Sequence, residues 1–160
     1  MGVKSNMAVV DVIKDKIERS GLSRIELHNS LRPLKSPTYF WLSPDRSGIK
    51  TNKLPESQTL KWEMFEGIVK KANSLGGTMY RGDSIARSGG KLGEDLTEEM
   101  IDGFIPLQYE GASYGDSVLS RSTYFSCILE WAGVVTIHKS TGRGSYISVN
   151  KEFRNIYVLI

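Results

Sequence analysis

Hydrophobic residues recur at intervals of three and four along much of this chain, the spacing that places them on one face of an α-helix. These stripes predict helices near residues 7–19, 23–31, 58–75, 98–105 and 120–132, with a shorter helical segment at 37–42. Branched apolar and polar residues instead alternate in 134–139 and 145–149, on either side of a glycine-rich turn, which predicts a β-hairpin. A short strand is expected at 78–80. The pattern predicts an α+β fold that is mostly helical.

The helix predicted at 120–132 divides into two faces. Ser120 precedes its first turn and can cap it by accepting a hydrogen bond from a free backbone amide. The apolar stripe predicts a buried face made of Phe125, Ile128, Leu129 and Trp131. The opposite face carries short or polar side chains that can approach a partner closely, namely Arg121, Ser122, Ser126 and Glu130. We therefore expect one buried and one accessible face.

The turn of the predicted hairpin combines glycine with positive charge. Arg143 lies between Gly142 and Gly144, and Lys139 stands at the base of the turn. Glycines lack a side chain, so the backbone beside them can approach a phosphate closely while the arginine reaches into a groove. This turn is a candidate contact with nucleic acid.

Two motifs, SRST at 120–123 and GRGSY at 142–146, resemble in content and separation the recognition helix and wing of winged helix-turn-helix domains, most of all the GntR-like regulators. In that family the first residues of the helix meet bases and phosphates in the major groove, and the wing meets the minor groove or the backbone. The resemblance implies a winged helix at 57–160, with an additional N-terminal helical segment at 1–56 that is separate from it or continuous with it. It implies DNA contacts by Arg121, Ser122 and Thr123 in the helix and by Arg143 in the wing. Together with the polar helix face and the turn, the predicted DNA-binding residues are Ser120, Arg121, Ser122, Thr123, Ser126, Lys139, Thr141 and Arg143.

The distribution of charge agrees with this interpretation. The chain has 160 residues and a net charge of +3, from 21 basic and 18 acidic residues. Residues 1–119 hold 16 of each sign, whereas 120–160 hold 5 basic and 2 acidic residues, so the excess coincides with the predicted helix and hairpin. Residues 94–116 are acidic and contain no lysine or arginine. We expect the C-terminal part to face phosphates and the acidic segment to face away from them.

Composition limits other classes of function. No apolar run approaches the ~18 residues that a membrane helix requires, and the N-terminus lacks the apolar centre of a signal peptide, so we expect a cytoplasmic protein without a membrane partner. Cys127 is the only cysteine, which excludes a disulfide within the chain. His28 and His138 lie far apart in sequence without a cluster of ligands around them. We expect neither a metal nor another cofactor.

The preferred function is that of a non-enzymatic transcriptional regulator that binds double-stranded DNA, and two alternatives stay open. Asp45, followed by Glu56 and Gln58, resembles the carboxylate pattern of the PD-(D/E)xK nucleases, with glutamine in the lysine position. That chemistry needs the carboxylates on adjoining strands around Mg²⁺, whereas turn-forming residues separate them here. The aromatic run at 39–41 can instead form the docking face of a protein-interaction module, with a homodimer or another protein bound through the N-terminal segment.

Overall fold

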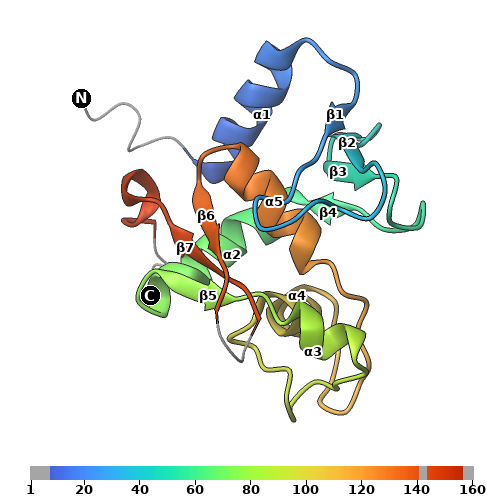
Figure 1. Cartoon of the computed structure of the whole chain (residues 1–160), viewed down its shortest axis with the longest axis vertical. Coiled ribbons are helices and arrows are strands. Elements are labelled where there is room, and N and C mark those ends of the chain that lie inside the picture. Colours follow the sequence, from blue (N-terminus) through green and yellow to red (C-terminus); the bar gives the residue numbers. More distant parts are fainter. Residues whose placement is uncertain (1–7, 141–143, 157–160) are drawn as a thin grey trace.

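The computed structural model describes residues 8–140 and 144–156 and has an α+β architecture with two antiparallel sheets (Figure 1). Its helices are α1 (Val9–Ser20), α2 (Trp62–Ser74), α3 (Asp83–Arg87), α4 (Ile101–Tyr109), α5 (Ser122–Trp131) and the 3₁₀ turn η2 (Lys151–Phe153). The predicted α+β class is confirmed. No helix in the described part of the chain is both long and apolar enough to cross a membrane.

Residues 25–61 contain a four-stranded sheet, where the sequence predicted two helices. The strands are β1 (Ile25–Glu26), β2 (Tyr39–Leu42), β3 (Gly48–Thr51) and β4 (Leu60–Lys61), paired in that order. The helices predicted at 23–31 and 37–42 are therefore wrong. Phe40 explains the second error, because it is fully buried and faces both Ile25 and Thr51 across the sheet. These pairings between distant residues, together with the preference of aromatic side chains for strands, outweigh the local helix signals.

The first error has a similar cause. Ile25 and Leu27 are buried while Glu26 between them is exposed, an alternation that belongs to a strand. The backbone amide of Leu27 donates to the carbonyl of Thr38 at 2.8 Å and extends the pairing beyond β1. The described part of the segment 1–56 thus holds one helix, α1, and three strands of the sheet, whose fourth strand, β4, lies beyond residue 56.

The second sheet has three strands, β5 (Thr78–Tyr80), β6 (Val135–His138) and β7 (Tyr146–Val149), in the order β5-β7-β6. The predicted strand at 78–80 and the predicted hairpin are both confirmed. In the hairpin, Val135 pairs with Val149 and Ile137 pairs with Ile147, all four side chains being buried. Thr141 and Arg143 of the predicted wing lie outside the described residues.

The four helices α1, α2, α4 and α5 follow the prediction with shifted ends. α2 begins at Trp62 because the two residues before it pair with β3 as a strand. α4 continues through Pro106 to Tyr109, four residues beyond the end predicted at 105. The proline removes one backbone donor, but its own carbonyl still accepts the amide of Glu110 at 3.1 Å.

One buried cluster joins both sheets around α5. Phe125 of α5 packs edge-on against Phe65 of α2, with ring centroids 4.9 Å apart. At the other end of α5, Trp131 packs edge-on against Phe40 of β2 at 5.1 Å. The predicted burial of Phe125, Ile128 and Leu129 is confirmed, whereas Trp131 is only partly buried. In Figure 1, α5 accordingly lies between the two sheets.

Candidate nucleic-acid interface

The polar opening of α5 is buried, so the accessible face predicted for this helix is wrong. Arg121 is 4% exposed, and Ser122 and Ser126 are fully buried. The Arg121 guanidinium donates to both carboxylate oxygens of Glu110, at 2.7 Å and 2.5 Å, and to the side chain of Gln58 at 3.2 Å. Because the guanidinium is buried and already bonded to Glu110 and Gln58, it cannot pair with a base.

The serines at the same end of α5 are held by one carboxylate from α4. Asp102 accepts the backbone N–H of Arg121 at 2.7 Å and of Ser122 at 2.9 Å. It also accepts the hydroxyls of Ser120 and Ser122, each at 2.7 Å. Burial raises the pKa of the Asp102 carboxyl, and the four hydrogen bonds oppose that effect. The hydroxyl of Ser126 donates to the carbonyl of Ser122 at 2.6 Å, so none of these three serines is free to bind a partner through its hydroxyl hydrogen.

Thr123 connects α5 to a network of charges formed by Arg81, which precedes α3, and by Asp83 and Arg87 of α3. Its hydroxyl accepts a hydrogen bond from the Arg81 guanidinium at 2.5 Å. Arg81 is buried and also donates to Asp83 at 3.3 Å, and the same carboxylate oxygen accepts Arg87 at 3.0 Å. One carboxylate therefore serves two arginines, which leaves a positive charge in excess at the exposed Arg87.

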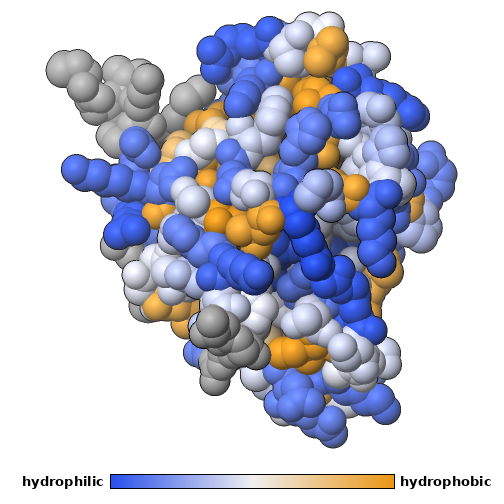
Figure 2. Space-filling view, in the orientation of Figure 1, coloured by the Kyte–Doolittle hydropathy of each residue, from blue (hydrophilic) through white to orange (hydrophobic). Residues whose placement is uncertain are grey.

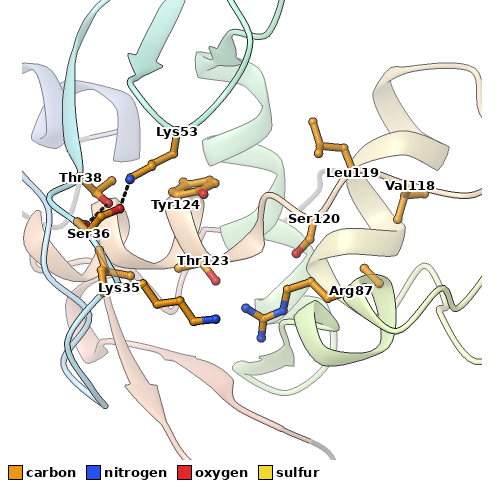
Figure 3. A pocket seen from close by; sticks show the side chains of 12 residues that line it. Lys35, Ser36, Thr38, Lys53, Arg87, Val118, Leu119, Ser120, Thr123 and Tyr124 are labelled. Carbon is orange, nitrogen blue, oxygen red and sulfur yellow. Dashed lines mark hydrogen bonds between the residues drawn. The ribbon is translucent and has the colours of Figure 1, made fainter.

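Arg87 and Thr123 belong to a pocket between α3, the first turn of α5 and the segment 34–38, with a cavity volume of about 480 Å³ (Figure 3). Three cations line it, Lys35, Lys53 and Arg87, and no carboxylate does. Figure 3 shows the ends of Lys35 and Arg87 pointing toward one another. Its uncharged lining includes the hydroxyls of Ser36, Thr38, Ser120 and Thr123 and the ring of Tyr124.

A second pocket of about 280 Å³ shares Arg87 with the first and extends to the base of the hairpin. Its charged lining consists of Arg32, Arg81, Arg87, Lys139 and the single carboxylate Asp83. We call the two pockets together the cationic groove. Figure 2 shows one face of the molecule, on which hydrophilic side chains predominate and hydrophobic patches lie between them. Of the predicted site residues in the described ranges, the groove brings together Ser120, Thr123 and Lys139.

The sequence analysis missed four exposed cations of the groove, Arg32, Lys35, Lys53 and Arg87. They lie outside the predicted recognition helix and wing, within a region whose total charge is balanced. A cation in a loop has no periodic pattern to mark it. The one feature that these four cations share in the sequence is that they lie outside residues 94–116, the part of the chain in which acidic residues are concentrated.

Comparison with known proteins adds no relative. No family model, curated protein or solved structure matches this chain. The assignment of function therefore depends on the geometry of the groove.

The residues of the nuclease alternative have partners of other kinds. Asp45 lies in the turn between β2 and β3 and accepts the hydroxyls of Ser43 at 2.8 Å and Ser47 at 2.7 Å. These hydrogen bonds, mainly those from Ser47, lower the pKa of Asp45 to about 2. Gln58 is bonded to Arg121. Within residues 8–140 and 144–156, no group of three or more His, Cys, Asp or Glu side chains is placed to hold a metal ion.

The predicted protein-docking face at 39–41 is divided by its strand conformation. Phe40 points into the core and is fully buried, so it cannot contribute to a docking surface. Tyr39 and Trp41 lie on the other face of β2 and are partly exposed. Arg24 covers Trp41, with its guanidinium 4.3 Å from the ring centroid. The continuous aromatic surface expected from the sequence is therefore not formed.

Proposed function

We propose that this protein binds DNA and that the cationic groove contacts the phosphates. The observation that carries the proposal is the convergence of Lys35, Lys53 and Arg87 on one pocket without a carboxylate in its lining. Like charges repel, so such a cluster raises the free energy of the isolated protein and lowers it when an anion enters. A polyanion gains further, because each neutralised phosphate releases condensed counterions.

The state of each cation supports this role. Lys35 is exposed and has no hydrogen bond or ion pair with any described residue. Arg87 is 54% exposed along its side chain, and the Asp83 carboxylate that orients it is shared with Arg81. Lys53 donates to the neutral hydroxyl of Ser36, a contact that orients its ammonium group without neutralising it. All three positive charges remain available to a phosphate.

The order of elements is compatible with the proposed winged helix. After the N-terminal sheet come a helix (α2), a strand (β5), further helices (α3 and α4), the helix α5 and a hairpin (β6 and β7). Lys139 stands at the base of that hairpin and lines the groove. The resemblance to GntR-like regulators adds transcriptional regulation as the proposed context, without an enzymatic step. We do not extend the proposal to base reading by α5, because every residue of that helix is buried or partly buried.

A salt titration of DNA binding tests the proposal. The probe is a labelled duplex with a single-stranded tail, so that both forms of DNA are offered. If three cations each meet one phosphate, the logarithm of the binding constant falls with the logarithm of salt concentration, with a slope of about −2.7 on duplex DNA or about −2.1 on a single strand. Lys35→Glu should weaken binding, whereas Lys151→Glu, at an exposed lysine of η2 outside the groove, should not. Absence of binding at low salt, or equal losses in both variants, would overturn the proposal.

A further inference from the structure

An aromatic ring forms one wall of the larger pocket of the groove. Tyr124 lies in the first turn of α5, is partly buried, and lines this pocket together with the three cations. In Figure 3 its ring lies on the side of the pocket from which Lys53 enters, and the ends of Lys35 and Arg87 are on the other side of Thr123. Four apolar side chains complete the uncharged part of the lining, namely Leu34, Ala86, Val118 and Leu119, and Leu119 is 47% exposed. The pocket thus offers an apolar and aromatic wall beside a cluster of cations.

An aromatic wall beside a cluster of cations is suited to bind a whole nucleotide rather than a phosphate alone. A cluster for phosphate alone needs only cations and donors, whereas a base also needs a flat apolar surface on which to stack. The cavity of about 480 Å³ lies within the size range of small-ligand sites, ~300–1,000 Å³. The hydroxyl of Thr123 lies between the ring of Tyr124 and the ends of Lys35 and Arg87, and the hydroxyl of Ser36 lines the pocket beside Lys53. Both can reach a sugar or a phosphate.

Duplex DNA cannot use such a pocket, because its bases are stacked and paired and its phosphates lie on a convex surface. A base reaches a concave aromatic pocket only when it is unpaired or has been turned out of the stack. No exposed side chain of α5 is available to enter a major groove in compensation. The groove is therefore better suited to a strand whose bases are free.

We infer that the groove binds single-stranded DNA, with one unpaired base stacked on Tyr124 and its neighbouring phosphates held by Lys35, Lys53 and Arg87. This inference rests on the proposed DNA binding and specifies its substrate. Stacking is available to every base, so the protein should discriminate between strand forms more than between sequences. Arg81 acts as a positioning residue, because it holds Thr123 directly and shares Asp83 with Arg87.

Fluorescence anisotropy with three probes tests the inference on the full chain. The probes are oligothymidylate of about 16 nucleotides, which covers a site of the usual size, the blunt duplex that it forms with oligoadenylate, and inorganic polyphosphate as an unlabelled competitor. We expect the single strand to bind at least tenfold more tightly than the duplex, and polyphosphate to compete poorly at equal phosphate concentration. Tyr124→Leu should weaken single-strand binding fivefold or more, as expected for loss of about one stacked base, while Tyr124→Phe retains the ring and the affinity.

Each remaining outcome counts against the inference. If the duplex binds as tightly as the single strand or more tightly, the single-strand inference is overturned and the proposed DNA binding stands. If neither the single strand nor the duplex binds, both the inference and the proposed DNA binding are overturned. Competition by polyphosphate as strong as by oligothymidylate identifies an anion site without a base subsite. If Tyr124→Leu fails to fold by circular dichroism, Lys35→Glu decides, because Lys35 is exposed and lies outside the core. A Lys35→Glu variant that keeps full affinity for the single strand removes the pocket from the interface.

Discussion

Asp102 of α4 and Ser122 at the start of α5 are joined by two hydrogen bonds, one from the Ser122 backbone N–H at 2.9 Å and one from its hydroxyl at 2.7 Å. The first turn of a helix has free amides that require acceptors, and here the acceptor comes from another helix. Glu110, at the end of α4, then pairs with Arg121. Arg121 and Ser122, two of the polar residues that suggested an accessible helix face, thus attach α5 to α4.

Removal of this carboxylate should destabilise the fold. Asp102→Ala leaves two buried backbone amides and two hydroxyls without their acceptor, and we expect a loss of at least about 2 kcal/mol in the free energy of unfolding. Ser120→Ala removes only one of the four bonds, at a partly buried position, and should cost about 1 kcal/mol or less. Denaturant unfolding of both variants measures the difference. Similar midpoints for Asp102→Ala and the parent would contradict the proposed role of the carboxylate.

The Glu110–Arg121 pair should make stability depend on pH. Hydrogen bonding from Arg121 lowers the pKa of Glu110 in the folded protein, and partial burial opposes this effect. A lowered pKa means that the contribution to stability is fully present above the ordinary pKa of glutamate and is lost as pH falls through the lowered value. In unfolding experiments between neutral pH and about pH 3, Glu110→Gln should therefore lose less stability on acidification than the parent. The control Glu18→Gln, at an exposed site on α1, should follow the parent profile.

The apolar stripe of α5 gives a third prediction. Ile128 is fully buried, so Ile128→Ala should cost about 2–5 kcal/mol, combining lost burial with the cavity left behind. Leu22→Ala is the matched control, because that side chain is 60% exposed and its removal should change stability by no more than about 0.5 kcal/mol. Denaturant midpoints check both values. Equal effects would mean that the stripe does not carry the core.

Elements with local packing were predictable from the sequence, and elements made by distant contacts were not. A buried face can be recognised within a few residues from the apolar stripes of α1, α2 and α5 and from the alternating residues of the hairpin. The burial of Phe40 depends instead on Ile25 and Thr51, which lie in other strands. Short-range patterns do not encode that pairing, so β2 was predicted as a helix.

The candidate site shows the same division. Lys139 was identifiable because it adjoins a turn with a strong local signature, and the structure places it in the groove. Arg121 was predicted to contact DNA because it lies at the start of a helix. Its guanidinium instead binds Glu110 and Gln58, which come from other parts of the chain. Lys35 and Lys53 are separated in sequence, and they line one pocket only because the N-terminal segment folds beside α5.

The final prediction compares two arginines in matched ion pairs. Arg87 pairs with Asp83 at 3.0 Å, and Arg19 pairs with Asp15 at 2.8 Å. In each pair the two residues lie four positions apart on a helix, and the arginine side chain is substantially exposed. Only Arg87 lines the cationic groove. Arg87→Ala should therefore weaken DNA binding and make the salt slope shallower by about one unit, as expected for one lost phosphate contact. Arg19→Ala should leave affinity and slope unchanged, because it removes the same charge and the same kind of pair outside the groove. If the two variants shift the titration equally, net charge rather than the groove governs binding.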